Sequence, residues 1–257
     1  MTANRITAVV NSKGGTTKTT TAVNLATAAA LNGMRVRLID LDDQGSATKW
    51  FGHSPDNDDL MRALLSGSSL DPLTVRTEVK GLELVPASVA LADTGRLQAE
   101  PGNNTLLRNC LRKTSLCDWV FIDSPGDLGL TTVMALSAAT EVLVPVPAGA
   151  LELDELPEVM KLIAKVQERL NEDLKIAGVL LTRFRIHGRN ASVLSRDVAA
   201  ELGRQLPDHV LKTVVRDDGR HGEAPAWRKP IALFDPDGRG DQDYRAVLTE
   251  LTSGGVA

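Results

Sequence analysis

The chain has 257 residues, of which 42% are apolar and 3% aromatic, and its 29 Lys and Arg against 33 Asp and Glu give a net charge of −4. This composition is typical of a globular protein and excludes wholesale disorder and fibrous repeats. No stretch approaches 18 consecutive apolar residues and the N-terminus shows no signal-peptide pattern, so we expect a cytoplasmic protein without membrane contact. We expect a single domain over residues 1–257.

Short apolar runs alternate with helical patterns along the chain. The runs predict strands at 6–10, 36–39, 119–122, 142–146, 176–181 and 213–215, and the clearest helical patterns lie at 19–31 and 152–170. Several runs are too continuously apolar to leave one face in water, which is typical of buried parallel strands. The alternation therefore predicts an α/β fold with a doubly wound, mostly parallel sheet flanked by helices.

The first predicted strand is followed by a loop of small residues, 11–20, with the sequence NSKGGTTKTT. A strand, such a loop and a helix together direct backbone N–H groups and a helix N-terminus toward one point, which suits a phosphate. Lys18 would then reach the β- and γ-phosphates, and the Thr19 hydroxyl is placed to bind Mg²⁺. Ser12 and Thr17 stand where the strict phosphate-loop pattern has glycines, so a simple Gly-Gly turn before an ordinary helix is the alternative.

The next predicted strand ends in the sequence DLDDQG, residues 40–45. Asp40 and Asp42 are two residues apart at the carboxyl end of a parallel strand, so their side chains point the same way, toward the edge where ligands bind in such sheets. Ordinary loop carboxylates are the alternative. We favour a functional pair.

The predicted strand 119–122 ends in a third acid, Asp123, followed by Ser-Pro-Gly-Asp. An apolar strand ending in Asp is the Walker B arrangement, in which the carboxylate holds a water bound to Mg²⁺. Many apolar strands end in Asp by chance. Three motifs in this order along one chain favour a nucleotide site.

The pattern K-G-G-x-x-K-T-T, in which Lys13 precedes Lys18 by five residues, resembles the deviant Walker A motif of the ParA/MinD family of ATPases. The resemblance runs from residue 5 to about residue 250 and is closest to small ParA proteins that lack an N-terminal helix-turn-helix domain. It implies that Lys13 reaches across a nucleotide-sandwiched homodimer to the phosphates of the partner subunit, much as an arginine finger does. It also implies that Asp42 orients or activates the attacking water and that Asp40 supports the Mg²⁺ shell.

The implied cofactors are ATP and Mg²⁺, and the implied site falls into three groups. The catalytic residues would be Lys13, Lys18 and Asp42; the nucleotide-binding residues Gly14, Gly15, Thr16, Thr17, Lys18, Thr19, Thr20 and Arg216; and the metal-binding residues Thr19, Asp40 and Asp123. Thr17, Asp43 and Gly126 depart from the glycine, proline and proline that the family usually has. If that glycine takes a positive φ, the β-branched Thr17 is strained.

Residues 175–230 carry eleven Lys or Arg against six Asp or Glu, so an acidic chain has a basic stretch. In small ParA proteins, basic residues of this region bind DNA through its backbone without reading sequence. By this resemblance we predict nonspecific binding of double-stranded DNA by Arg183, Arg185, Arg189, Arg196 and Arg204, weakening steeply with salt. The alternative is a solvated helix face.

The leading hypothesis is therefore a ParA-type ATPase that positions DNA or another large cargo. ATP would close a homodimer, the dimer would bind nucleoid DNA, and a ParB-like partner would stimulate hydrolysis, which we expect to be weak on its own. The runner-up is an ATP-dependent, amide-forming metabolic synthetase on the same fold, against which Lys13 argues. A third class, an iron–sulfur reductase, is disfavoured because Cys110 and Cys117 both precede the 119–122 strand, and we expect both to be buried thiols.

Overall fold

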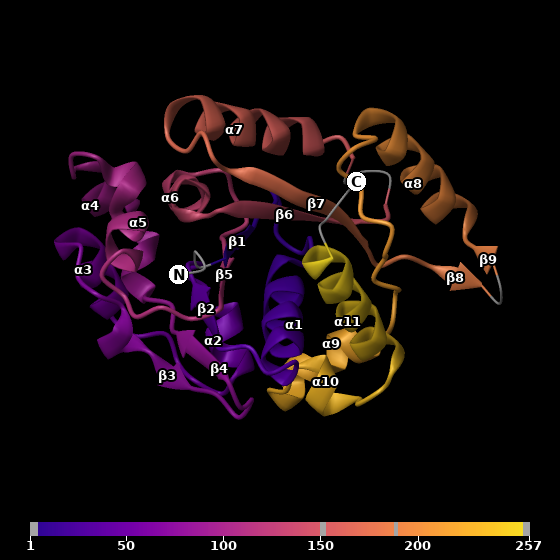
Figure 1. The fold of residues 1–257 in the computed structure, drawn as a ribbon, viewed down its shortest axis with the longest axis horizontal. Coiled ribbons are helices and arrows are strands. Elements are labelled where there is room, and N and C mark those ends of the chain that lie inside the picture. The colour runs from indigo at the N-terminus through magenta and orange to yellow at the C-terminus, as the bar shows by residue number, and fades with distance from the viewer. Residues whose placement is uncertain (1–4, 150–152, 188–189, 254–257) are drawn as a thin grey trace.

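A seven-stranded sheet forms the centre of the protein (Figure 1). The structure is a computed structural model and describes residues 5–149, 153–187 and 190–253. The strand order is β3-β4-β2-β5-β1-β6-β7. Neighbouring strands pair in parallel except β3, which is antiparallel to β4. The strands are β1 (Arg5–Val9), β2 (Val36–Asp40), β3 (Val75–Arg76), β4 (Leu82–Val85), β5 (Trp119–Asp123), β6 (Glu141–Pro147) and β7 (Lys175–Thr182), and a separate hairpin contains β8 (Ile186–His187) and β9 (Asn190–Ala191).

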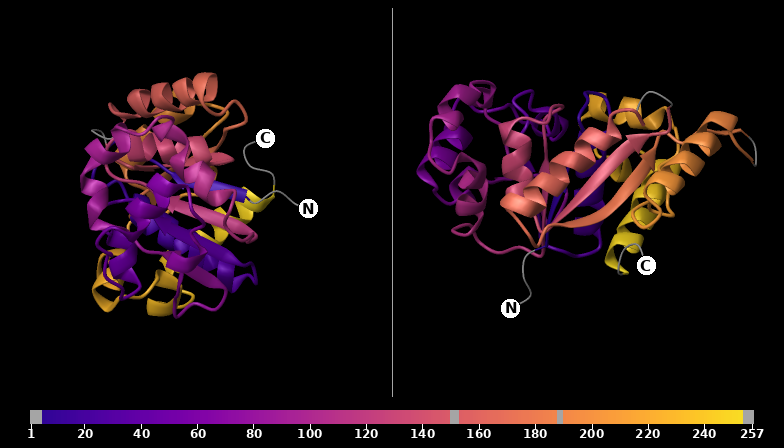
Figure 2. Two further views of the ribbon diagram at one scale, coloured as in Figure 1. Left: turned by 90° about the vertical axis from the view of Figure 1, so that its left-hand side faces the viewer. Right: turned by 90° about the horizontal axis from the view of Figure 1, so that it is seen from above.

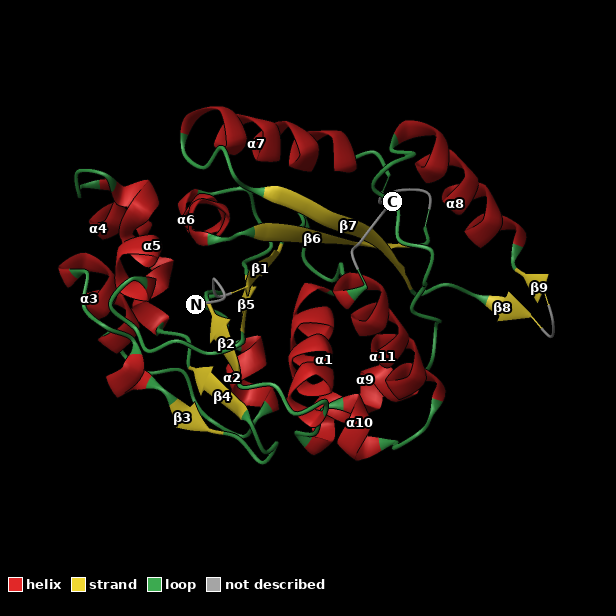
Figure 3. Ribbon diagram, viewed as in Figure 1, coloured by secondary structure: helices red, strands yellow, loops and turns green. Residues whose placement is uncertain are grey.

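Helices cover both faces of this sheet (Figures 1 and 3). In the views of Figures 1 and 3, α6 and α7 lie on one side of β6 and β7, and α1 and α11 lie on the other. The helices are α1 (Lys18–Leu31), α2 (Ser46–Trp50), α3 (Asp59–Ser66), α4 (Thr94–Gln98), α5 (Leu106–Leu111), α6 (Leu130–Ala138), α7 (Leu156–Arg169), α8 (Val193–Gln205), α9 (Arg220–Glu223), α10 (Ile231–Phe234) and α11 (Arg239–Thr252). Every residue of β2 and β5 is buried because both faces of the sheet are covered. The predicted doubly wound, mostly parallel α/β fold is confirmed.

The two predicted helices form with small shifts at their ends. The first begins at Lys18, one residue early, and its alanine-rich sequence is almost entirely buried between the sheet and α11. The second was predicted over 152–170 and is observed from Leu156 to Arg169, with 150–152 outside the described residues. It begins where Pro157 can occupy the first turn, because the backbone N–H that proline lacks has no helical partner there.

The strand predicted at 213–215 is wrong. This segment runs beside β7, with the N–H of Val215 donating to the carbonyl of Leu181, but only single bridges form, at Val210 and Arg216. The carboxylate of Glu250 on α11 accepts hydrogen bonds from the N–H groups of Lys212 and Thr213, at 2.7 and 2.9 Å. A side chain thus takes the place of the strand ladder at this edge. Neither β3 nor β4 was predicted from the sequence.

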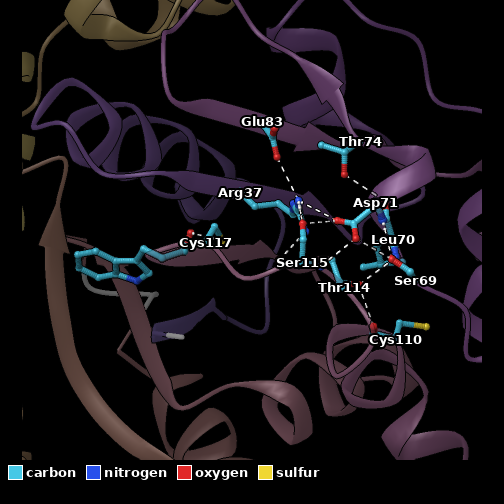
Figure 4. A network of polar contacts seen from close by, with 11 residues as sticks. Arg37, Ser69, Leu70, Asp71, Thr74, Glu83, Cys110, Thr114, Ser115 and Cys117 are labelled. Carbon is cyan, nitrogen blue, oxygen red and sulfur yellow. Dashed lines mark hydrogen bonds and ion pairs between the residues drawn. The ribbon is translucent and has the colours of Figure 1, made fainter. Parts of the chain in front are cut away.

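A buried ion cluster lies near the amino end of β2 (Figure 4). The Arg37 side chain, 5% exposed, places its guanidinium 3.1 Å from both Asp71 and Glu83, and Nη2 also donates to the Ser115 hydroxyl at 3.3 Å. Glu83 lies beside Arg37 on β4, whereas Asp71 begins a short 3-10 helix (Asp71–Leu73) and Ser115 lies in the loop after α5. The cluster therefore ties the sheet to both segments.

The β8–β9 hairpin and α8 follow β7 and lie at one end of the molecule (Figure 2, right, in orange). The Ser192 hydroxyl caps α8 by accepting from the N–H of Ser195 at 3.1 Å. Within the described ranges no helix has both the length and the apolar content needed to span a bilayer. Cys110 and Cys117 are both buried free thiols, as predicted.

Candidate functional site

The loop between β1 and α1 lies at the carboxyl edge of the sheet and is pinned at its start. The Asn11 side chain donates to the carbonyl of Pro145 on β6 at 2.7 Å and accepts from the N–H of Ser12 at 2.6 Å. Two later residues, Gly15 (φ 78°) and Thr17 (φ 64°), take left-handed conformations. Glycine adopts this conformation freely, but in a β-branched residue it costs roughly 1–3 kcal/mol. Thr17 is therefore strained, as the departure from glycine predicted.

Lys18, the first residue of α1, is buried inside this loop. Its Nζ donates to the carbonyl of Lys13 at 2.8 Å and to the Thr16 hydroxyl at 3.3 Å. Burial lowers the pKa of Lys18, and the nearby negative charge of Asp123 acts in the opposite direction. The amine is thus held across the loop, where the backbone N–H groups of the helix N-terminus also point.

Lys13 is exposed, and its amine makes a different contact. Its Nζ lies 3.7 Å from Glu155, the residue that precedes α7, and the Ser12 hydroxyl donates to the same carboxylate at 3.0 Å. Both side chains of the pair are well exposed, so the pair is weak. Within one chain, Lys13 therefore contributes its carbonyl to Lys18 and leaves its amine at the surface.

Asp40 and Asp123 end the neighbouring strands β2 and β5 and are paired in register. The Asp40 carboxylate accepts from both the N–H and the hydroxyl of Thr48, each at 2.7 Å, and burial raises the pKa of Asp40 to about 6. The two carboxylate oxygens of Asp123 are buried and have no hydrogen-bond partner among the described residues. Burial, followed by the charge of Asp40, raises the pKa of Asp123 well above its ordinary value, while the Thr19 hydroxyl acts to lower it.

These donors fit a magnesium ion held jointly with phosphate. Mg²⁺ prefers oxygen ligands, keeps several waters, and in nucleotide sites takes only one or two groups from the protein. The buried, unpartnered carboxylate of Asp123 near the Thr19 hydroxyl matches that need, because an ion there would supply the positive charge that would balance this carboxylate. No group of three or more His, Cys, Asp or Glu side chains within the described ranges could hold a metal by itself.

Asp42 lies at the mouth of the same site and is half-buried. Its Oδ1 accepts from the N–H of Gln44 at 3.0 Å. Burial is the largest cause of the raised pKa of Asp42, and the charges of Asp43 and Asp127 add to it. Gly126, from the loop after β5, approaches the phosphate loop so closely that a Cβ on it would lie 3.1 Å from the N of Gly14.

Two cavities lie along the loop. The larger, about 780 Å³, is bordered by residues 14–20 together with Asp42, Gly126, Arg183 and Arg228. The smaller, about 290 Å³, is bordered by Thr17, Thr20, Arg183, Arg216, His221 and Tyr244, among others. Arg216 is held there by Asp243, whose carboxylate accepts from the Arg216 Nε at 2.9 Å and from the Arg216 N–H at 2.9 Å.

The predicted DNA-binding arginines differ in their contacts. Arg185 pairs with Asp217 at 3.0 Å, and Arg204 pairs with Glu201 one turn away on α8. Arg196 on α8 is exposed and has no ion-pair partner in the described part of the chain, and Arg189 lies outside the described residues. Arg183 stands apart because it borders both cavities of the loop.

Sequence reasoning missed Thr48 and Glu155. Thr48 lies eight residues after the acid that it contacts, within a small-residue run (SAT) that carries no motif of its own. Glu155 lies directly before α7, more than 140 residues after Lys13 in the sequence. No local pattern therefore indicates this contact.

A phosphate loop between a central parallel strand and a helix, with acids at the ends of the neighbouring strands, defines a P-loop nucleotide-binding protein. The sequence profile of a family described as AAA domain matches residues 4–176. The chain is 34% identical to the sporulation initiation inhibitor protein Soj of Bacillus subtilis, over 98% of this chain and 99% of Soj. It is 35% identical to the chromosome partitioning protein ParA of Myxococcus xanthus, over 97% of this chain and 88% of that protein. The chain belongs to the ParA/MinD family of P-loop ATPases.

A similar solved structure carries a different name. Cobyrinic acid a,c-diamide synthase from Mycobacterium smegmatis, with bound ADP and magnesium, superposes with a TM-score of 0.83 at 31% identity, covering 98% of this chain and 97% of that one. The chain is therefore similar in sequence to proteins named for partition and shares its fold with one named for amide formation.

Proposed function

We propose that the chain, acting as one domain over residues 1–257, is a partition or positioning ATPase that uses ATP and Mg²⁺. Binding of ATP would form a homodimer that binds DNA, and hydrolysis would release it. The observation that carries this proposal is the buried, unpartnered carboxylate of Asp123 beside the phosphate loop that holds Lys18. A buried charge without a partner is costly, and a bound Mg²⁺ would remove that cost.

The nucleotide would be held by residues 14–20, whose backbone N–H groups and the Lys18 amine face its β- and γ-phosphates. Thr19 and Asp123 would hold the magnesium, which neutralises the charge that develops on the phosphates. Asp40, fixed by Thr48 and paired in register with Asp123, would support the magnesium shell as a positioning residue. Asp42, at the mouth of the site, would orient the attacking water.

Lys13 would act between two subunits. Its amine is at the surface in a weak pair with Glu155 and is free to exchange that partner for a phosphate in the opposite subunit. A second positive charge on the phosphates would then appear only when two ATP-loaded subunits meet, which couples dimerisation to hydrolysis.

Size-exclusion chromatography with and without ATP and Mg²⁺ tests this proposal. We expect wild type to shift from monomer to dimer with ATP, Asp42→Ala to stay dimeric because hydrolysis is blocked, and Lys13→Ala to remain monomeric. Glu158→Ala, a change of an exposed acid on α7 that pairs with Lys161, is the control and should behave as wild type. Elution of all four proteins as monomers under every condition would contradict the proposal.

DNA contact by the basic stretch is a second part of the proposal, supported by the exposure of Arg185, Arg196 and Arg204 on and near α8. Retention of the ATP-loaded protein on nonspecific double-stranded DNA should fall steeply as salt rises. Arg189→Glu and Arg196→Glu should each weaken retention, and Arg169→Glu, on α7, is the control. A ParB-like protein encoded nearby would be the partner that stimulates hydrolysis.

An amide-forming synthetase is the second candidate, favoured by the similarity to the cobyrinic acid a,c-diamide synthase structure. Such an enzyme would turn over ATP only when a carboxylic acid and a nitrogen donor are present. ATP turnover accelerated by DNA, with no response to cobyrinic acid and glutamine, would support the partition reading. The opposite result would support the synthetase.

A further inference from the structure

We propose that Arg183 binds the α-phosphate of the nucleotide and does not belong to the DNA-binding surface. This inference rests on the proposed nucleotide function and adds to it a residue that the phosphate-loop motif does not include. It assigns a different ligand from the DNA backbone that the basic stretch suggested.

The position of Arg183 between the two cavities is the first observation. Among the described residues, Thr17, Thr20 and Arg183 border both the 780 Å³ cavity and the 290 Å³ cavity. The larger cavity contains the loop N–H groups and Lys18, which suit the β- and γ-phosphates. The smaller contains Tyr244 and His221, whose rings meet edge to face with centroids 5.8 Å apart, and suits an apolar ring. Whatever joins the two parts of a nucleotide, its α-phosphate and ribose, lies at their border.

The backbone around Arg183 directs it to that border. The carbonyl of Thr182 accepts from the N–H of Ala148 at 2.8 Å, and the N–H of Phe184 donates to the carbonyl of Val215 at 3.0 Å. Arg183 lies between these two fixed points with φ 49°, a left-handed conformation that arginine rarely adopts. The Thr182 hydroxyl lies 2.8 Å from the hydroxyl of Thr17, which is itself left-handed. Thr17 thus contacts the residue that precedes Arg183, and strained residues such as Thr17 and Arg183 are concentrated at ligand sites.

The charge of Arg183 is also free. Neither an ion pair nor a side-chain hydrogen bond engages its guanidinium in the described part of the chain, although it is exposed. Two other arginines, Arg185 close by in the sequence and Arg216 at the wall of the smaller cavity, are both engaged in ion pairs. Arg185 is held by Asp217 and Arg216 by Asp243. An arginine without a partner at the wall of a phosphate cavity matches a charge-assisted contact to a phosphate oxygen.

Calorimetric titration with Mg-ADP and with a non-hydrolysable ATP analogue tests the inference. Arg183→Gly keeps the left-handed backbone without strain, so the fold should persist, and a thermal melt checks this. We expect this variant to bind both nucleotides more weakly by the same factor, about ten- to a hundredfold, because the α-phosphate is common to both. Arg183→Lys should recover part of the affinity. The matched control Arg185→Ala should bind as wild type.

Three results would overturn the inference. Wild-type affinity in Arg183→Gly would remove Arg183 from the nucleotide site. Weaker binding of the ATP analogue alone would place the contact at the γ-phosphate. Unchanged nucleotide affinity with reduced retention on double-stranded DNA would return Arg183 to the DNA surface. Failure of the wild-type protein to bind either nucleotide is distinguishable from all three, because it would overturn the proposed function itself.

Discussion

The central strands carry buried charged side chains at both ends. At one end the charge has partners within the chain, and at the other it has none among the described residues. Near the amino end of β2, Arg37 contacts Asp71, Glu83 and Ser115, and of its guanidinium nitrogens Nε alone has no partner within the described ranges (Figure 4). At the carboxyl end of β5, neither oxygen of Asp123 has a hydrogen-bond partner among the residues that the structure describes. A buried charge that is satisfied within the chain stabilises the fold, whereas one that is not raises the free energy of the chain until a ligand arrives. The difference separates a structural end of the sheet from a functional end.

The largest effect is expected for Asp123→Asn, which removes the unsatisfied charge while keeping the shape. ATP hydrolysis should fall about a hundredfold or more, because a metal-holding group is lost. Stability in the absence of nucleotide should rise by about 1–3 kcal/mol, since a neutral amide costs less to bury than a carboxylate. Thermal unfolding without nucleotide measures the second effect. Asp127→Asn, at an exposed position, is the control, and a lower melting temperature for Asp123→Asn would contradict the comparison.

Arg37→Met should have the opposite consequence at the other end. It leaves Asp71 and Glu83 without their shared cation, and because both acids remain partly exposed we expect a loss of about 2–3 kcal/mol in the free energy of unfolding. Urea titration measures it, and nucleotide affinity should not change. Arg35→Met is the matched control, because Arg35 pairs with Asp118 in solvent and should barely affect stability. Equal losses in both variants would show that burial of the ion pair is unimportant.

The pH dependence of stability sharpens the comparison at Asp40. Because the pKa of Asp40 in the folded protein, about 6, lies above its ordinary value of 3.8, the folded state keeps a proton that the unfolded state releases. The contribution of Asp40 is therefore most favourable below about pH 4 and is lost as the pH rises toward 6, by on the order of 2 kcal/mol. Urea unfolding of wild type and Asp40→Asn between pH 4 and 7 isolates this difference from other acids. Wild type gaining stability relative to the variant across that interval would be the contrary outcome.

The smallest effect is expected for Thr17→Gly, which relieves backbone strain in the loop. The gain in stability should stay below about 1 kcal/mol, because the hydroxyl contact with Thr182 is lost at the same time. Nucleotide affinity should rise severalfold as the loop relaxes. Asp237→Gly is the control, since Asp237 also has a positive φ, 59°, but does not border the loop cavities. A tighter nucleotide in both variants would point to general stability as the cause.

The sequence predicted most of the sheet and the order of its motifs, because continuous apolar runs and strand-end acids are local signals. Strands β1, β2, β5, β6 and β7 appear within two residues of their predicted bounds. Strand β4 was missed because it has only four residues and contains the charged Glu83, which forms an ion pair with Arg37 on another strand. The strand at 213–215 was wrong because Glu250, distant in sequence, accepts from the N–H of Thr213 and of the preceding Lys212.

The candidate site divides in the same way. The loop, Lys18 and the three acids were predicted because each is a short pattern of adjacent residues. The contacts that set their chemistry were not, since Thr48 on Asp40 and Glu155 beside Lys13 depend on how distant segments fold together. Arg183 borders the two cavities and has a left-handed backbone conformation, which composition alone cannot show.

The approach of Gly126 to Gly14 has a mechanical consequence. A Cβ on Gly126 would lie 3.1 Å from the N of Gly14, so the two loops pack closely. The segment after Gly126 is tied to α6 by the Thr132 hydroxyl, which donates to the carbonyl of Asp127 at 2.7 Å. One short segment of the chain thereby connects the phosphate loop to the start of α6. We expect a movement of the phosphate loop on nucleotide binding to shift the start of α6, on the face of the sheet away from α1.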